Sequence, residues 1–267
     1  MKLSNANNLV DNYTGFADFY DEFMDDIPYD DWSCFIVSKL KEHKIDSGIV
    51  CELGCGTGEI TKRLQKAGYD MIGIDLSEDM LSVAMNKFYD EEISGIMLLN
   101  QDMRSFELYG TVDAIVSICD SLNYITEPED LLKVFKLVNN YLEKDGLFIF
   151  DLKTDYFYRT DYADGEFSDE AEDAILRWKN HYDTETKLNH YEVEIEYAYE
   201  DGEDKFTESH VQRAYSKEEI TSLIEQSGMK LLEMIDYDTM DVPTENSRRI
   251  FVIASEGFQK GKHYTGE

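Results

Sequence analysis

Three glycines lie within five positions in the stretch VCELGCGTGEI, which runs from Val50 to Ile60. Glycine weakens regular structure, so repeated glycine directly after a short apolar run indicates a tight turn that a ligand approaches closely. Asp75 ends the next apolar run, about 20 residues after Gly54. An acid at that distance can accept hydrogen bonds from both hydroxyls of a ribose. The pattern therefore predicts a nucleoside-binding crevice.

The spacing and charge of the turn indicate which nucleoside binds there. The turn reads G-x-G-x-G with Glu52 in front of it, whereas dinucleotide enzymes use G-x-G-x-x-G. A carboxylate at the turn repels a pyrophosphate but attracts an ammonium group. S-adenosylmethionine carries an ammonium group and a sulfonium and has no phosphate, so the charge favours that cofactor. An NAD-dependent oxidoreductase and a nucleoside-binding regulator without turnover remain as alternatives.

The composition excludes some partners. The 267 residues include 57 acids and 25 bases, which gives a formal net charge of -32. Such a surface repels phosphate backbones and acidic lipid headgroups, and the sequence has no basic patch, so we expect neither a nucleic-acid nor a membrane partner. The acids either keep the protein soluble or attract a cationic ligand. No apolar run resembles a membrane span or a secretion signal, which favours a cytoplasmic protein.

Short apolar runs alternate with helical patterns from residue 48 to residue 152. Strands are expected at 49–53, 70–76, 95–100, 112–118 and 147–152. Helices are expected between them, with Ser77 capping one helix and Pro128 in the first turn of another. This alternation predicts an α/β fold with a doubly wound, mostly parallel sheet of the Rossmann-like type. Two further strands, at 229–238 and 248–255, are expected to pair antiparallel at one edge and complete seven strands.

Two segments interrupt this pattern. Aromatic residues recur at helical spacing in residues 11–32, which predicts an amphipathic helix, and a second helix is expected from Asp31 to about His43. Residues 153–213 contain three longer alternating runs, typical of half-buried antiparallel strands, with a hairpin turn at 200–204. The predicted organisation is therefore an N-terminal helical lid (1–47), a core (48–152 and 214–257) and an antiparallel β insert that caps the substrate (153–213).

Four motifs resemble those of class I S-adenosylmethionine-dependent methyltransferases in order and spacing. They are ELGCGTG, GIDLSEDML, NQDMRSF and DAIVSICDSLNYI. The resemblance implies that Glu52, Gly54, Cys55 and Gly56 line the methionine end of the cofactor and that Asp75 holds its ribose. It further implies cofactor contacts from Leu76, Met80, Gln101, Asp102 and Met103 near the adenine, and from Cys119 and Asn123 near the reacting sulfur. Leu76 and Met80 could equally be ordinary helix-packing residues.

The loop after the fourth strand narrows the substrate. It lacks the Asn-Pro-Pro-Tyr of amide and base-amine methyltransferases and the Pro-Cys of cytosine-C5 enzymes. The aromatic N-terminal helix and the insert resemble the small-molecule branch that includes glycine and amino-sugar N-methyltransferases, although amino-sugar enzymes often have a histidine where this chain has Tyr124. We therefore expect methyl transfer to a small molecule, at an amine nitrogen, without a metal.

Candidate residues for positioning the acceptor or removing its proton are Tyr13, Tyr124 and His210. Each has a plainer explanation, which for Tyr13 is packing of the aromatic stripe and for His210 a polar position on an exposed strand face. Exposed tyrosines on the insert would suit a homodimer contact. The identity of the methyl acceptor does not follow from the sequence.

Overall fold

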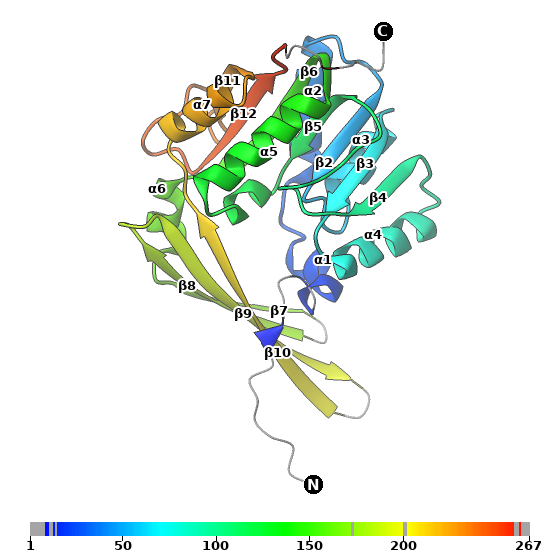
Figure 1. Ribbon diagram of the computed structural model, residues 1–267. Helices are drawn as coiled ribbons and strands as arrows, with labels where there is room; N and C mark the ends of the chain where they lie inside the picture. The colour runs from blue at the N-terminus through cyan, green and yellow to red at the C-terminus, as the bar shows by residue number, and fades with distance from the viewer. Residues whose placement is uncertain are drawn as a thin grey trace.

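A seven-stranded sheet forms the centre of the molecule. The structure, a computed structural model, describes residues 9–10, 13, 15–171, 174–199, 202–258 and 262 (Figure 1). Its strands are β2 (Ile49–Leu53), β3 (Asp70–Asp75), β4 (Ile96–Asn100), β5 (Val112–Ser117), β6 (Leu142–Lys153), β11 (Lys230–Asp236) and β12 (Arg249–Ser255). The order across the sheet is β11-β12-β6-β5-β2-β3-β4. The strands β2 to β6 pair in parallel, and β12 pairs antiparallel with both β6 and β11. The predicted mostly parallel sheet with an antiparallel edge is confirmed.

Helices cover both faces of this sheet. They are α2 (Tyr29–Glu42), α3 (Glu59–Lys66), α4 (Glu78–Asp90), α5 (Pro128–Tyr141) and α7 (Lys217–Gln226). Their boundaries follow local chemistry. Ser77 accepts a hydrogen bond from the backbone N–H of Met80 at the start of α4, and Pro128 opens α5. Ser216 and Glu219 form a reciprocal capping box at the start of α7.

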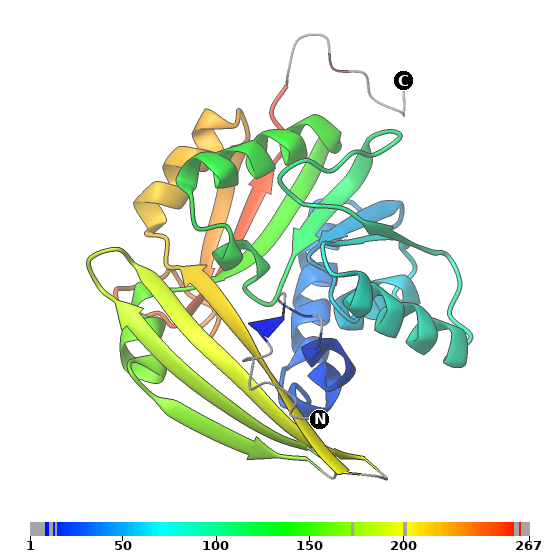
Figure 2. The ribbon, with the colours of Figure 1, turned by 60° about the horizontal axis from the view of Figure 1, so that its bottom comes forward.

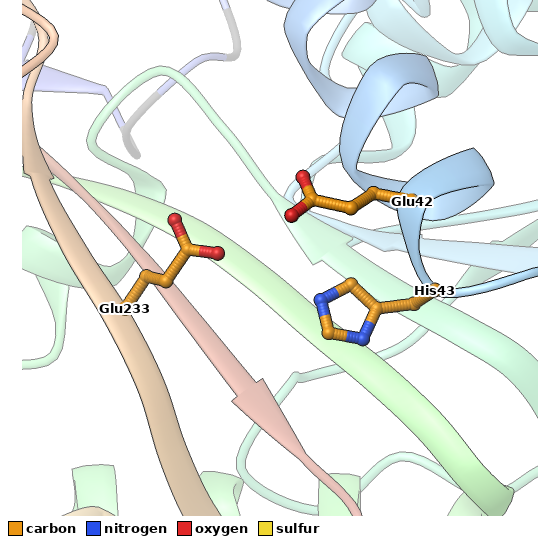
Figure 3. Close-up of side chains that lie close together, drawn as sticks. All are labelled: Glu42, His43 and Glu233. Atoms are coloured by element: carbon orange, nitrogen blue, oxygen red, sulfur yellow. The ribbon is translucent and has the colours of Figure 1, made fainter.

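Ion pairs join the end of α2 to the edge strand β11. The Lys39 ammonium lies 3.2 Å from the Glu42 carboxylate and 2.7 Å from that of Glu233. Figure 3 shows Glu42 and His43 at the end of the helix, facing Glu233 on the strand. These partly exposed ion pairs contribute little stability individually, but they fix where α2 meets the sheet.

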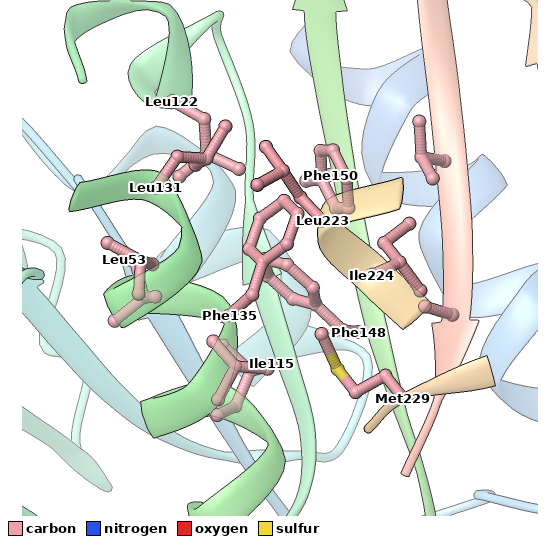
Figure 4. Packing of buried hydrophobic residues seen from close by; sticks show 14 of the residues in the cluster. Leu53, Ile115, Leu122, Leu131, Phe135, Phe148, Phe150, Leu223, Ile224 and Met229 are labelled. Carbon is pink, nitrogen blue, oxygen red and sulfur yellow. The ribbon is translucent and has the colours of Figure 1, made fainter. Parts of the chain in front are cut away.

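Two apolar clusters fill the space between the sheet and its helices. On one face, α5 and α7 pack on the strands through Leu131, Phe135, Leu223 and Ile224, which meet Phe148 and Phe150 (Figure 4). On the other face, α2 and α3 contribute Trp32, Ile36, Leu40, Ile60 and Leu64. Burial on both faces explains why the central strands are nearly continuous apolar runs.

The N-terminal prediction is partly wrong. The described part of residues 11–32 does not form one helix; it contains a 3-10 turn at Phe16–Asp18 (η1), the four-residue α1 (Tyr20–Phe23) and the start of α2, while residues 11, 12 and 14 lie outside the described residues. Pro28 explains the break, because the residue before a proline is disfavoured in helical conformation. The second helix begins at Tyr29, two residues earlier than predicted, and ends at Glu42.

A second sheet lies at the carboxyl ends of the parallel strands (Figures 1 and 2). Its order is β1-β10-β9-β8-β7. The three predicted long strands are β8 (Ala174–Asp183), β9 (Leu188–Tyr199) and β10 (Gly202–Arg213); part of the predicted turn at 200–204 lies outside the described residues. Three elements were not predicted: the exposed strand β7 (Glu166–Glu170), the short α6 (Asp155–Phe157) with the π-helical turn Tyr158–Tyr162, and β1 (Leu9–Val10). The strand β1 pairs in parallel with β10, so the N-terminal segment joins the insert sheet.

Candidate active site

A cavity of about 660 Å³ opens at the carboxyl ends of β2, β3 and β5. The order of the sheet reverses between β2 and β5, and open α/β sheets bind their ligands at such a point. The cavity is large enough for a small-molecule ligand. Most of the predicted cofactor residues line it: Glu52, Gly54, Cys55, Gly56, Asp75, Leu76, Met80, Gln101, Asp102, Met103 and Cys119.

The glycine turn forms the floor of the cavity beside β2. Gly54 and Gly56 have φ values of 72° and 50°, which favour glycine. A Cβ on Gly54 would lie 2.7 Å from the Ser121 side chain, whereas a Cβ on Gly56 would meet no atom within 4 Å. Gly54 is therefore required by the packing of the protein itself, and Gly56 leaves room for a ligand to approach the backbone.

Glu52 lies in the wall of the cavity and is only 3% exposed. Its carboxyl group accepts a hydrogen bond from the Thr61 hydroxyl on α3. Burial raises the pKa of Glu52 to about 8, the Thr61 hydrogen bond opposes that rise, and the nearby Asp75 adds to it. The carboxyl group of Glu52 is therefore expected to ionise when a cation lies beside it.

Asp75 ends β3 with both carboxylate oxygens held by the backbone. The N–H of Ser77 donates to Oδ1 at 2.9 Å, and the N–H of Gly56 donates to Oδ2 at 2.8 Å. Burial raises the pKa of Asp75, while these N–H donors lower it. The arrangement fixes the carboxylate in one orientation at the mouth of the glycine turn, where it can accept hydrogen bonds from a diol.

The cavity is also lined by Leu76, Met80, Asp102 and Met103. Met80 is 2% exposed, whereas Leu76 is 66% exposed and leaves an apolar side chain free to cover a ligand. The Asp102 carboxylate is paired with the guanidinium of Arg104, at 2.9 Å from Nε, and this pairing lowers the pKa of Asp102.

The loop after β5 has an unusual backbone. Cys119 and Asp120 both have left-handed φ values, 64° and 51°, ahead of the turn η2 (Ser121–Tyr124). Cys119 and Tyr124 line the cavity, but Asn123 does not. Asn123 is fully buried and donates to the carbonyl oxygens of Lys153 and Arg213 at 3.1 and 2.8 Å. It joins this loop to both sheets.

Tyrosine hydroxyls converge where the N-terminal segment, the loop and the insert meet. The hydroxyl of Tyr13 lies 2.5 Å from that of Tyr124, which also contacts the hydroxyl of Tyr191. Burial raises the pKa of all three well above the usual value, so these groups stay neutral. His210 lies behind them: its Nδ1 is 3.4 Å from the Tyr124 oxygen, and its side chain does not line the cavity.

Tyr191, Tyr20 and Tyr29 were not predicted as site residues. Tyr20 and Tyr29 line the cavity beside Tyr13. Tyr20 belongs to the aromatic stripe of the N-terminal segment, so its spacing could have identified it. Tyr191 alternates with polar residues on β9, but only the three-dimensional arrangement brings its hydroxyl to the loop after β5.

One cluster has the composition of a metal site. The ligand atoms of Glu42, His43 and Glu233 lie within 4.8 Å of one another (Figure 3). However, the Lys39 ammonium already contacts both carboxylates and supplies the positive charge that a metal would bring. The cluster joins α2 to β11, and none of its three residues lines the cavity, so we assign it a structural role.

No helix in the described parts of the chain is both long enough and apolar enough to cross a bilayer.

Comparison with known proteins agrees with this geometry. Residues 50–146 match the family model of a methyltransferase domain. YqeM of Bacillus subtilis (strain 168), which is named as a methyltransferase, is 34% identical over 245 residues, 91% of this chain and 97% of that protein. A Streptomyces venezuelae protein named dTDP-3-amino-3,4,6-trideoxy-alpha-D-glucopyranose N,N-dimethyltransferase is 26% identical over 130 residues, 49% of this chain and 52% of that protein.

A solved structure extends the likeness to the whole fold. The crystal structure of an S-adenosylmethionine-dependent methyltransferase from Clostridium acetobutylicum ATCC 824 matches with a TM-score of 0.81 and 29% identity. The match covers 92% of this chain and 99% of that one, so both sheets are included. These similarities decide in favour of a methyltransferase over the alternative of an NAD-dependent oxidoreductase. The chain belongs to the S-adenosylmethionine-dependent methyltransferases, and S-adenosylmethionine is its cofactor.

Proposed function

We propose that this methyltransferase acts on an amine nitrogen of a small molecule that carries no carboxylate or phosphate near that nitrogen. The charge of the cavity wall is the observation that carries the proposal. Its acidic residues are Asp75, Glu78, Asp79 and Asp102, together with Glu52, which ionises beside a cation, and Glu59, which is already paired with Lys62, Arg63 and Lys87. Among the described residues that line the cavity, Arg104 is the one strong base, and it is already paired with Asp102. Such a wall attracts a cationic amine and repels an anion.

The acceptor would bind between the cofactor and the tyrosines. S-adenosylmethionine supplies an electrophilic methyl group, so the chain has to hold the nucleophile in line and exclude water. Tyr13 and Tyr124 offer neutral hydroxyls in the cavity wall, which the rings of Tyr20 and Tyr29 also line. Aromatic faces and neutral hydroxyls suit an ammonium group.

The N-terminal segment and the insert would close this site. The Ser77 hydroxyl donates to the carbonyl oxygen of Tyr13 at 2.7 Å, which places the segment over the start of α4. We therefore assign residues 1–47 as a lid, residues 153–213 as a cap, and residues 48–152 with 214–257 as the cofactor-binding core. The name of the Streptomyces relative, an N,N-dimethyltransferase of an amino sugar, supports nitrogen as the acceptor atom.

An acceptor screen tests the proposal. The purified chain is incubated with S-adenosylmethionine and a panel of ethanolamine, putrescine, glucosamine and glycine, together with the alcohol and carboxylate analogues ethylene glycol, glucose and acetate. We expect S-adenosylhomocysteine release with one or more of the carboxylate-free amines and none with the analogues, with the methyl group on nitrogen by mass spectrometry. Turnover only with glycine or with an oxygen acceptor would refute the proposed acceptor class. Cofactor binding without any turnover across a wider amine panel would favour a regulator.

The pH dependence of cofactor binding tests the proposed role of Glu52. Because the pKa of Glu52 is raised to about 8, its carboxyl group is mainly protonated in the free protein at pH 7. An ammonium group beside it favours the carboxylate, so binding lowers this pKa and releases a proton. We expect the affinity to rise roughly tenfold from pH 6 to pH 7.5.

Calorimetric titration in phosphate and in Tris measures that proton release, because the two buffers differ in ionisation enthalpy. Glu52→Gln should abolish both the release and the rise in affinity with pH. Equal apparent enthalpies in the two buffers for the unmodified protein would place the ammonium group of the cofactor elsewhere.

A further inference from the structure

We propose that Tyr124, His210 and Glu208 form a buried relay that removes the proton of the acceptor amine, with Glu208 also holding the N-terminal segment closed. This inference rests on the proposed methylation of an amine. Tyr124 lines the cavity, whereas His210 and Glu208 act through it as positioning residues. The family resemblance points to neither Glu208 nor this connection.

The three side chains form a continuous path away from the cavity. His210 Nδ1 lies 3.4 Å from the Tyr124 oxygen, and His210 Nε2 lies 3.2 Å from Glu208 Oε2. The side chains of His210 and Glu208 are 1% and 0% exposed. Nε2 makes no hydrogen bond of ordinary geometry, and the Glu208 carboxylate is the charged group that lies beside it. The same order of groups, a hydroxyl, an imidazole and a carboxylate, allows a histidine to take up a proton in hydrolases.

Packed rings hold the imidazole in place. It stacks on Tyr191 with a centroid distance of 4.7 Å and an interplanar angle of 3°, and Tyr191 stacks in turn on Trp178. Tyr13 meets the imidazole edge-on at 5.0 Å. The groups that face His210 are thus Tyr13 from the N-terminal segment, Tyr124 from η2, Tyr191 from β9 and Glu208 from β10. Among them, Glu208 is the carboxylate that can balance an imidazolium.

Glu208 has a second function that couples the relay to closure of the site. Its carboxylate accepts hydrogen bonds from the backbone N–H groups of Tyr13, Gly15 and Phe16, at 2.7, 3.0 and 2.9 Å. Three convergent N–H donors form the kind of concave backbone site that binds anions. The N-terminal segment is thereby held on β10, with the Tyr13 hydroxyl against that of Tyr124. When the segment lies on β10, Tyr13 contacts both Tyr124 and His210.

The proton transfer balances without another reactant. The N–H bond of the acceptor breaks and its proton goes to the Tyr124 oxygen, while the hydroxyl proton of Tyr124 passes to His210 Nδ1. The resulting imidazolium faces the Glu208 carboxylate. Since burial raises the pKa of Tyr124, its hydroxyl passes a proton on without remaining ionised. The path requires that Nδ1 is unprotonated beforehand, with the imidazole proton on Nε2 towards Glu208.

The tautomer of His210 tests this geometry without any acceptor. The chain contains five histidines, and replacing His43, His181, His190 and His263 by glutamine leaves His210 as the single imidazole. In the ¹⁵N-labelled protein at pH 8, two-bond ¹H–¹⁵N correlation spectra should show the proton on Nε2 and a bare Nδ1. Glu208→Gln should reduce the preference for that tautomer. A proton on Nδ1 in the unmodified site would overturn the relay.

Kinetics with the amine that turns over in the acceptor screen provide the second test. His210→Phe should lower kcat at pH 7 by about 10²-fold, the usual size of a general-base contribution. The loss should shrink as the pH approaches the pKa of the free amine, because the amine is then deprotonated before it binds. The matched control is His190→Phe, on the exposed face of β9.

The two tests separate the relay from the proposed function. An equal loss at every pH would assign His210 a packing role and refute the relay. Failure of every amine in the screen would refute the proposed function, while the tautomer measurement would still decide the geometry.

Discussion

Replacing Asp75 by alanine is expected to weaken binding of S-adenosylmethionine by about 100-fold. Hydrogen bonds to a charged group contribute about 1.5–3 kcal/mol each, and the proposed contact with the ribose diol contains two. A loss of roughly 3 kcal/mol in binding free energy corresponds to that factor. The carboxylate is already oriented by the N–H groups of Gly56 and Ser77, so it binds without reorganising. Calorimetric titration with S-adenosylmethionine and S-adenosylhomocysteine measures the change.

Two variants separate the ribose contact from damage to the strand. Asp75→Asn keeps an oxygen for one backbone N–H but loses the charge, so its affinity should fall between those of the parent and the alanine variant. Asp70→Ala, at the exposed start of the same strand, should bind normally. If Asp75→Ala binds within threefold of the parent while its far-ultraviolet circular dichroism is unchanged, the ribose is held by another group.

The parallel core could be predicted because its signals are local. The strands β2, β3 and β5 are apolar runs bounded by glycine and acids, and the helices between them begin at recognisable caps such as Ser77 and Pro128. The failures lie where the sequence pattern carries no burial information. All five residues of β7 are exposed, and its sequence EFSDE has no alternation towards a core. Pro28 marks the break in the N-terminal segment, but the helical spacing of the aromatic residues favoured one continuous helix.

The cavity residues that we propose to hold the cofactor could likewise be predicted as neighbours from the sequence, since Gly54, Gly56 and Asp75 are close together at the ends of adjacent strands. The residues that we propose at the acceptor end could not be predicted in this way. Tyr13, Tyr124, Tyr191 and Glu208 come from four separate segments, and the pairing of β9 with β10 sets which of their side chains face inwards. A shift of one residue in that pairing would turn Tyr191 outwards, and periodicity alone cannot fix such a register.

The buried ion cluster beneath the loop after β5 leads to the second large prediction. Arg249 on β12 donates to the carboxylates of Asp151 on β6 and Asp120 in the loop, the latter at 2.9 Å. Lys153 lies 3.2 Å from Asp120, and Gln212 of the insert donates to it at 2.8 Å. Although burial opposes ionisation, these cations lower the pKa of Asp120. The cluster joins the core to the insert and holds Cys119 and Asp120 in their left-handed conformations.

Arg249→Met should therefore lower the free energy of unfolding by about 3–5 kcal/mol, because it leaves Asp151 as an uncompensated buried charge. Urea denaturation at pH 7 measures this loss. The matched control is Arg248→Met: the neighbouring Arg248 is 52% exposed and pairs with Asp161 at the surface, so its loss should be below about 1 kcal/mol.

The pH dependence of this difference distinguishes lost charge from lost packing. In the unmodified protein the pKa of Asp120 is lower in the folded state than in the unfolded state. Its carboxylate therefore adds stability at pH values above the unfolded pKa, and that stability is lost as the pH falls through the folded pKa. In Arg249→Met the sign reverses for the unpaired carboxyl, since protonation removes the buried charge. The stability that Asp120 adds changes only below its unfolded pKa of 3.8, so a narrowing of the difference in unfolding free energy between pH 7 and pH 5 reports protonation of the carboxyl that Arg249→Met leaves unpaired, and we expect that narrowing. A difference that stays constant over this range would mean that Arg249 stabilises the fold through its packing over Trp32, 4.8 Å from the ring centre, rather than through its charge.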